Sequence, residues 1–302
     1  NGKVMFPKKV NINEVGARDG LQNERANIPL EAKVEFIDLL SACNYKYIEV
    51  GSFVSSKWVP QMENSNLVYD KIKKNKTTLY PLLVPNITGL NKALESNVRS
   101  ICIFASASET FSLKNTNASI EKTKKNIMKI LKIALKNNIK IRAYLSCVLG
   151  CPYEGKISYK KTASLAKFLI NEGCYEVSLG DTVGYGTPFE TQKLIHEVSK
   201  KINYSKIAMH LHDTYGQALA NIYASMQLGI SSFDTSIGGL GGCPYAKGAS
   251  GNVATEDVLY MLNGMGINNG INLKKVLAAS KFIYNLLGRD IASKTAAAMV
   301  TK

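Results

Sequence analysis

Long apolar segments are missing from this 302-residue chain: no uninterrupted hydrophobic run approaches the ~18 residues that a bilayer-spanning helix requires. A secretory signal, with its charged start, apolar run and cleavage site, is also absent from the first residues. Because the first residue is Asn1 rather than Met, a targeting segment that had been removed would leave no trace. We therefore expect no membrane partner and an intracellular location, in the cytoplasm or, after loss of a transit peptide, in the mitochondrial matrix.

Cysteine is scarce, and its spacing does not suggest a disulfide framework. The chain has six cysteines, several of them in apolar stretches. With 302 residues, 45% of them hydrophobic, the chain can bury a large core without covalent cross-links. Cys147 and Cys151 form a C-x3-C pair, but no second pair completes a zinc site. We interpret these thiols as small buried hydrophobic groups in a reducing compartment.

Acidic residues are outnumbered: Asp and Glu total 23 against 38 Lys and Arg, which gives a net charge of +15. Such an excess is compatible with nucleic-acid binding. The charges are nevertheless spread along the chain and are not interleaved with aromatic residues, so we attribute them to solvated outer helix faces and expect no nucleic-acid partner. A positive field of this kind would also attract polyanionic small molecules.

Short apolar, β-branched stretches recur eight times, and each is followed by a segment with helical periodicity. They lie at residues 10–15, 47–50, 78–84, 100–105, 139–145, 176–179, 207–211 and 233–237. This alternation predicts parallel β-α-β units, and eight of them predict an α/β fold closed into a (β/α)8 TIM barrel; a doubly wound open sheet is the alternative. No linker rich in Pro, Gly and Ser divides the chain, so we expect one domain over residues 1–302, with a helical extension after about Asn252.

Local signals mark where the intervening helices begin and end. Thr187 and Glu190 have the spacing of an N-terminal capping box, and Pro188 stands at the first helical position between them. Gly173 and Gly229 stand where helices are expected to stop, because Gly tolerates the left-handed conformation of a C-terminal cap.

Charged residues stand at the ends of the first two expected strands, where the active site of such a barrel lies. Arg18 and Asp19 follow the first strand directly; in isolation, a loop salt bridge would explain them equally well. Glu49 ends the second strand, where it could orient a water or a neighbouring group, or pair with Arg18.

Histidine is rare, with three in the chain, and two of them, His210 and His212, stand at the end of the seventh expected strand. Residues i and i+2 of a strand face the same side, so both rings can point into one site.

After the eighth strand, six of the fourteen residues 238–251 are Gly. This stretch contains Cys243 and is followed by Asn252; we expect a lid loop, the alternative being a flexible turn with a passive thiol.

One combination of these residues has the composition of a cation site: Asp19, His210, His212 and Asn252. They offer one carboxylate, two imidazoles and one amide oxygen, but no thiolate. This mixed nitrogen and oxygen set suits six-coordinate Mg²⁺ or Mn²⁺ better than zinc. The sequence therefore predicts a divalent cation, Mg²⁺ or Mn²⁺, as the cofactor.

These motifs resemble the hydroxymethylglutaryl-CoA lyase family, within a wider group of metal-dependent lyases and Claisen synthases. The Arg-Asp-Gly stretch at 18–20 and the His-x-His stretch at 210–212 are shared by the wider group, whereas Gly-Gly-Cys-Pro-Tyr-Ala at 241–246 is the specific part. The resemblance covers nearly the whole chain. Two residues depart from it: Arg25 stands where Lys is expected, and Gly239 where Ala is expected.

The resemblance implies roles for individual residues. The four candidate ligands would hold the cation, and the implied catalytic residues are Arg18, Asp19, Glu49, His210 and Cys243. Arg18 would stabilise an enolate, Glu49 would organise Arg18, and Cys243 would transfer a proton at the nascent acetyl group. The implied substrate-binding residues are Arg18, Gln22, Arg25, Arg142, Tyr144, Ser178, Asp181 and Thr182.

The resemblance also implies an acyl-CoA substrate and a carbon–carbon lyase that cleaves (3S)-3-hydroxy-3-methylglutaryl-CoA to acetoacetate and acetyl-CoA by a metal-assisted retro-aldol reaction. The alternative is an acetyl-CoA-dependent Claisen synthase of the isopropylmalate or homocitrate type. Such chains usually continue well past the barrel, whereas this one stops at Lys302, so we expect the lyase. We also expect a homodimer, because two-fold pairing is the commonest assembly.

Overall fold

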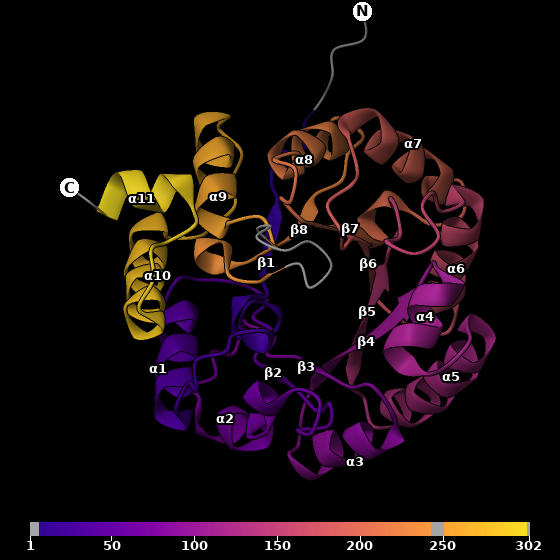
Figure 1. Ribbon diagram of the computed structural model, residues 1–302, viewed down its shortest axis with the longest axis horizontal. Helices are drawn as coiled ribbons and strands as arrows, with labels where there is room; N and C mark the ends of the chain where they lie inside the picture. The colour runs from indigo at the N-terminus through magenta and orange to yellow at the C-terminus, as the bar shows by residue number, and fades with distance from the viewer. Residues whose placement is uncertain (1–5, 243–250, 301–302) are drawn as a thin grey trace, which may run out of the picture.

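Eight parallel strands form the centre of the protein in the computed structural model, which describes residues 6–242 and 251–300. The sheet has the order β1-β8-β7-β6-β5-β4-β3-β2, and a bridge between Glu14 and Ile48 joins β1 to the segment just before β2 (Figure 1). The predicted (β/α)8 barrel is therefore confirmed, and the open sheet is rejected. The strands are β1 (Asn11–Glu14), β2 (Gly51–Ser52), β3 (Leu82–Leu83), β4 (Ser100–Ser106), β5 (Lys140–Ser146), β6 (Glu176–Asp181), β7 (Ile207–Leu211) and β8 (Ser232–Thr235).

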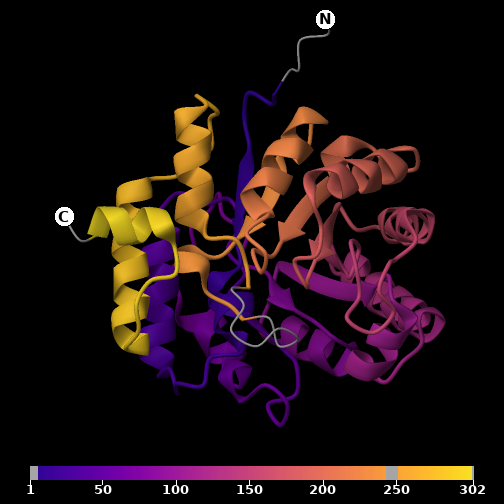
Figure 2. The same ribbon diagram turned by 45° about the horizontal axis from the view of Figure 1, so that its top comes forward.

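Helices surround the strands and cover their outer face (Figures 1 and 2). The barrel helices are α1 (Leu30–Ser41), α2 (Ser65–Lys71), α3 (Ile87–Glu95), α4 (Glu109–Thr116), α5 (Ile120–Lys136), α6 (Tyr159–Asn171), α7 (Pro188–Ser199) and α8 (Ala218–Gln227). The expected C-terminal extension consists of α9 (Thr255–Gly264), α10 (Leu273–Leu287) and α11 (Lys294–Val300). Helix α10 packs against α1 and so covers the barrel beside β1.

The strands differ in length, and β3 is shorter than the sequence suggests. The apolar stretch at 78–84 predicts seven residues, but regular pairing is limited to Leu82 and Leu83. Pro81 stands directly before β3, and Pro85 stands two residues after it. Proline has no N–H to donate, so the ladder cannot extend regularly through either residue. Strands β4 and β5 contain no proline, and each has seven residues.

Helix boundaries follow the local signals. The N-terminus of α7 has the predicted capping box, with the Thr187 N–H donating to Glu190 Oε2 at 3.1 Å. Helices α6 and α8 stop just before Gly173 and Gly229, whose φ angles are +115° and +88°. Residues with a Cβ adopt this region at a cost, which explains glycine at both positions.

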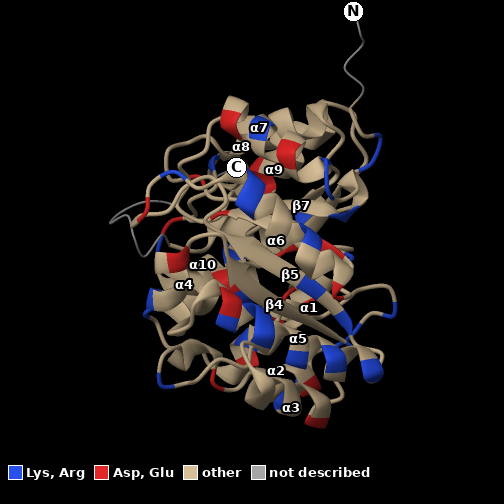
Figure 3. Cartoon of the chain, turned by 90° about the vertical axis from the view of Figure 1, so that its right-hand side faces the viewer, with Lys and Arg blue, Asp and Glu red and all other residues tan. Residues whose placement is uncertain are grey.

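Charged side chains of both signs are intermixed over the outer helices, and the view in Figure 3 shows no stripe of one sign. Among the described residues, no helix combines the length and the apolar character needed to cross a bilayer. The five described cysteines are all buried and free of disulfides.

Candidate metal centre and active site

A single turn of π-helix, Gly16–Gly20, follows β1 and carries Arg18 and Asp19. The N–H groups of Arg18, Asp19 and Gly20 all donate to the carbonyl oxygen of Val15, at 3.2, 2.8 and 3.2 Å. A Cβ on Gly20 would lie 2.7 Å from the Cβ of Leu240, so this close approach requires glycine. The turn therefore places two charged side chains at the C-terminal end of the barrel, next to the end of β7.

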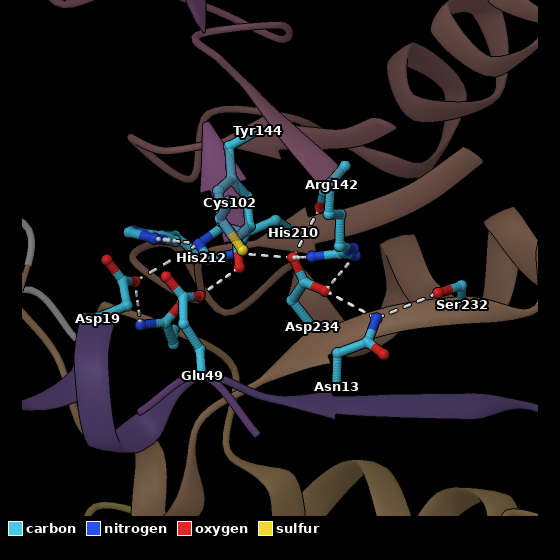
Figure 4. Close-up of polar contacts among 12 residues, drawn as sticks. Asn13, Asp19, Glu49, Cys102, Arg142, Tyr144, His210, His212, Ser232 and Asp234 are labelled. Atoms are coloured by element: carbon cyan, nitrogen blue, oxygen red, sulfur yellow. Dashed lines mark hydrogen bonds and ion pairs between the residues drawn. The ribbon is translucent and has the colours of Figure 1, made fainter. Parts of the chain in front are cut away.

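Asp19, His210 and His212 converge at this end, with one ligand atom from each within 4.8 Å of the others (Figure 4). His210 Nε2 lies 3.2 Å from His212 Nε2 and 3.6 Å from Asp19 Oδ2. The two histidines stand on one face of the chain at the end of β7, as their spacing predicts. Asn252 lies close to this group although it is distant from Asp19 in the sequence, because Asn252 and His212 form a β-bridge.

The chemistry of this cluster fits a divalent cation. Burial and the neighbouring His210 lower the pKa of His212 to about 3, so its ring is neutral at pH 7 and has a nitrogen lone pair to offer. Burial alone would raise the pKa of Asp19, but Arg18 and the two imidazoles outweigh it and lower the pKa to about 2. Two imidazoles and a carboxylate are the donors that Mn²⁺ and similar cations accept. The cluster is therefore a possible site for a divalent cation.

Asn252 interacts with this cluster through its amide nitrogen. Its Nδ2 donates to Asp19 Oδ2 at 2.7 Å, and the side chain is buried. The amide oxygen is the atom that would bind a cation. Asn252 thus lies beside the other three predicted ligands, and its own role as a ligand stays a prediction.

Arg18 is buried in a network of acceptors next to the cluster. Its Nε donates to Glu49 Oε1 at 2.6 Å, and its Nη1 donates to Asp19 Oδ1 at 2.8 Å and to Gln22 Oε1 at 3.2 Å. Glu49 also accepts a hydrogen bond from the Tyr144 hydroxyl. Burial raises the pKa of Glu49 above its ordinary value, although Arg18 opposes this shift.

These hydrogen bonds reach only the Nε and Nη1 groups of the Arg18 guanidinium. Three of its five N–H groups have acceptors, and among the described residues the Nη2 group has none. Its Cζ lies 5.5 Å from the centroid of the Tyr144 ring. The arrangement provides an oriented positive charge with two N–H donors left for a ligand.

Asp234, on β8, is the centre of a second polar group beside the cluster (Figure 4). Its Oδ1 accepts from Asn13 Nδ2 at 3.0 Å and Arg142 Nη2 at 2.7 Å. Its Oδ2 accepts from Ser178 Oγ at 2.6 Å and Arg142 Nη1 at 3.2 Å, and lies 3.2 Å from His210 Nδ1. We call these five residues the Asp234 cluster. Arg142 holds the pKa of Asp234 below its ordinary value despite burial.

The sequence analysis did not select Asp234 or Asn13. The available signal was an acidic residue in an otherwise apolar strand, similar to the one that selected Glu49 at a strand end. Arg142 and Ser178 were selected as substrate-binding residues, but both are fully buried and hydrogen bonded to Asp234.

The remaining predicted residues have varied surroundings. Asp181 accepts hydrogen bonds from the backbone N–H groups of Gly184, Tyr185 and Gly186, so its carboxylate shapes the loop after β6. Thr182 accepts from the Cys147 N–H at 3.3 Å. Arg25 is exposed on the loop after the π-helical turn. Their substrate contacts stay predictions, and Cys243 and most of the predicted lid lie outside the described residues.

Known proteins resemble this chain over nearly its whole length. It is 49% identical over 297 residues to a Pseudomonas aeruginosa protein named 3-hydroxy-3-isohexenylglutaryl-CoA/hydroxy-methylglutaryl-CoA lyase, covering 98% of this chain and 99% of that protein. A crystal structure of hydroxymethylglutaryl-CoA lyase from Pseudomonas aeruginosa has a TM-score of 0.96 at 49% identity, covering 98% and 99% of the two chains.

A third similar protein has a structure that contains bound small molecules. The structure of an HMG-CoA lyase from Acinetobacter baumannii, in complex with coenzyme A and 3-methylmalate, has a TM-score of 0.93 at 33% identity, covering 98% of this chain and 96% of that one. Residues 9–283 match the family described as HMGL-like. On its sequence, its barrel and these relatives, the chain belongs to the HMGL-like family.

Proposed function

We propose that the protein is a carbon–carbon lyase that cleaves (3S)-3-hydroxy-3-methylglutaryl-CoA to acetoacetate and acetyl-CoA. The observation that carries this proposal is the position of the buried Arg18 guanidinium directly beside the Asp19, His210 and His212 cluster. The names of relatives at about half identity over nearly the whole chain support the same reaction, and the coenzyme A complex of a relative at 33% identity supports an acyl-CoA substrate.

The cation would be held by Asp19, His210 and His212, with Asn252 as a fourth candidate ligand. We infer Mg²⁺ or Mn²⁺, because the set contains nitrogen and oxygen donors and no thiolate. Such a cation supplies one piece of chemistry: it lowers the pKa of an alcohol that it contacts.

The reaction requires one bond to break and two protons to move. The 3-hydroxyl loses its proton, the bond between C3 and C2 breaks, and C3 becomes the ketone carbon of acetoacetate. The bonding electron pair passes to the thioester as an enolate, which becomes acetyl-CoA when its carbon takes up a proton.

Arg18 would stabilise that enolate. Glu49 and Asp19 fix the guanidinium from one side, and burial removes the water that would otherwise screen its charge. The two N–H groups of Nη2 can donate to the thioester oxygen as negative charge develops there. The proton donor for the new methyl group would be Cys243, a role that rests on the family resemblance.

One assay tests the proposal. The chelated protein is incubated with the hydroxymethylglutaryl thioester with and without added Mg²⁺ or Mn²⁺, and acetoacetate is measured. We expect release only with the cation, and loss of turnover in Cys243→Ser without a comparable loss of Mn²⁺ binding, since the thiol is not a proposed ligand. Turnover confined to a parallel assay with acetyl-CoA and 2-oxoacids would instead identify a Claisen synthase.

Two further expectations concern the assembly and the compartment. We propose a homodimer, which sedimentation of the full chain would test. Location in the cytoplasm or in the mitochondrial matrix stays a prediction from the sequence.

A further inference from the structure

We propose that Asp234 is a positioning residue for the cation site: it fixes the proton of His210 on Nδ1 and so directs the lone pair of Nε2 toward Asp19 and His212. Asp234 Oδ2 lies 3.2 Å from His210 Nδ1, and His210 Nε2 faces the other two ligands (Figure 4). A neutral imidazole has one N–H, so an acceptor at Nδ1 leaves Nε2 unprotonated.

The partners of Asp234 leave its carboxylate as an acceptor. The Asn13 amide nitrogen and the Arg142 guanidinium can only donate hydrogen bonds, and together they reach both carboxylate oxygens. A carboxylate surrounded by donors has no proton to give to His210. The contact at 3.2 Å is therefore a donation from the His210 Nδ1–H to Asp234 Oδ2.

The carboxylate is also held from several directions. Its partners stand on β1, β5, β6 and β7, so Asp234 cannot move relative to the strands without losing hydrogen bonds to four of them. Arg142, whose Nε also donates to Glu176 Oε2 at 2.5 Å, supplies the positive charge that makes a buried carboxylate tolerable. In this arrangement, Arg142 and Ser178 act through Asp234.

The second imidazole has no comparable support. His212 Nδ1 is buried and has no hydrogen-bond partner among the described residues. Both rings face the cluster, but only His210 has its tautomer set by a carboxylate. Partners of this kind orient metal-binding histidines, and their loss typically weakens metal affinity by about 10- to 100-fold.

This inference rests on the proposed cation site but not on the identity of the substrate. Its test therefore uses Mn²⁺ alone, and a chain that binds Mn²⁺ without cleaving the thioester would refute the proposed reaction while leaving this inference intact.

Asp234→Asn is the informative variant. Asn13 Nδ2 and Arg142 Nη2 both need an acceptor at Oδ1, so the amide oxygen is expected there. The NH2 group would then take the place of Oδ2, beside Ser178, His210 and Arg142 Nη1. That NH2 donates to His210 Nδ1 and moves the ring proton to Nε2, where it blocks the lone pair. We expect Mn²⁺ affinity, measured by titration with electron paramagnetic resonance, to fall about 10- to 100-fold.

Asn13→Ala is the matched control. It removes a hydrogen bond to the same carboxylate on the side away from His210 and leaves the acceptor at His210 Nδ1, so Mn²⁺ affinity should fall far less than in Asp234→Asn. Thermal unfolding of both variants shows whether each is folded. Unchanged Mn²⁺ affinity in a folded Asp234→Asn variant, or an equal loss in Asn13→Ala, would overturn the inference.

A second measurement does not depend on a variant that folds. The chain has three histidines, and His196 lies exposed on α7, so ¹⁵N-histidine labelling of the full chain gives few signals. Long-range ¹H–¹⁵N spectra of the metal-free protein, at a pH where the ring is neutral, and of the Mg²⁺-containing protein should show His210 protonated on Nδ1 and bare on Nε2. Detection of a neutral His210 ring with its proton on Nε2 and none on Nδ1 would contradict the assignment.

Discussion

Two groups of residues around buried carboxylates share β8, and one of them, the Asp234 cluster, contains a guanidinium that the other lacks. The other group, which we call the Glu14 cluster, consists of Glu14, Glu256, Thr235 and Thr255. Glu14 and Glu256 are both fully buried, but within residues 6–242 and 251–300 neither forms an ion pair. The comparison separates the effect of a charge partner on the pKa of a buried acid from the effect of hydrogen bonds alone.

Hydrogen bonds in the Glu14 cluster tie β1 to the segment that follows β8. Glu14 Oε1 accepts from the N–H groups of Gly16 and Ile237 at 2.8 and 2.9 Å, and its Oε2 accepts from Thr255 Oγ1 at 2.7 Å. Glu256 accepts from the Gly238 N–H, at 3.0 and 2.8 Å from its two oxygens. These contacts hold the start of the Gly-rich stretch against the barrel.

The two groups have opposite pKa shifts. Burial raises the pKa of Glu14 to about 7 and that of Glu256 to about 8, although several hydrogen bonds oppose the shift. In the Asp234 cluster, Arg142 reverses the effect of burial and keeps the pKa of Asp234 low. In these two groups, neutral donors offset burial only in part, whereas Arg142 together with His210 overcomes it for Asp234. The acid that contacts a candidate metal ligand is the one whose charge is fixed.

Removing the Arg142 guanidinium should have the largest effect on stability, because it leaves the buried acid of the Asp234 cluster, like those of the Glu14 cluster, without a charge partner. Arg142→Met leaves Asp234 and Glu176 without their buried cation, and we expect a loss of about 3–5 kcal/mol in the free energy of unfolding. Urea denaturation of the metal-free protein measures it. The double variant Arg142→Met/Asp234→Asn should recover part of the loss, and Arg25→Met, on the surface, should lose little. An equal loss in the single and double variants would refute the charge argument.

Neutralising the Glu14 cluster should change the pH dependence of stability. Below pH 4.5 Glu256 is protonated in both folded and unfolded chains; as pH rises toward 8, the unfolded chain loses that proton first. The folded state then binds more protons, so its stability falls with rising pH. Glu256→Gln has no proton to lose and should reduce this fall between pH 5 and pH 8 by on the order of 3 kcal/mol.

The same urea experiment at several pH values measures that difference. It is done in chelator, so that cation binding does not contribute its own pH dependence. Glu95→Gln, a change of an exposed acid on α3, is the matched control and should follow the unmodified chain. A Glu256→Gln curve parallel to that of the unmodified chain would show that Glu256 keeps an ordinary pKa.

Sequence reasoning predicted the barrel and several side chains that meet at its mouth, because these depend on local patterns. Eight apolar stretches, and the i and i+2 spacing of His210 and His212, are visible within a few residues. The contacts within the Asp234 cluster and the Glu14 cluster depend instead on the register between strands, which brings together residues that are far apart in the sequence. Asp234 contacts residues that are 221, 92, 56 and 24 positions away, and no local pattern indicates which of them it will meet.

The length of β3 was missed for a local reason that the sequence did contain. Pro81 and Pro85 limit the ladder, but the apolar pattern at 78–84 outweighed them in the prediction. Asp234 and Glu14 were visible as acids in apolar strands; what the sequence could not show was that one has Arg142 beside it and the other has only neutral donors.

The smallest expected effect tests how much one neutral donor contributes to a buried acid. Thr255 donates to Glu14, whereas Thr235 Oγ1 lies 2.6 Å from Thr255 Oγ1 and donates to that oxygen. Thr255→Val removes a hydrogen bond to Glu14 that is stronger when Glu14 is ionised, so it should cost about 1 kcal/mol at pH 5 and about 2 kcal/mol at pH 8. Thr235→Val removes the other hydroxyl of the pair and should cost about 1 kcal/mol at both pH values. Urea denaturation of the two variants measures both costs. Equal pH dependence in the two variants would mean that Thr255 does not stabilise the charged form of Glu14, and that the Gly16 and Ile237 N–H groups are the donors that oppose burial.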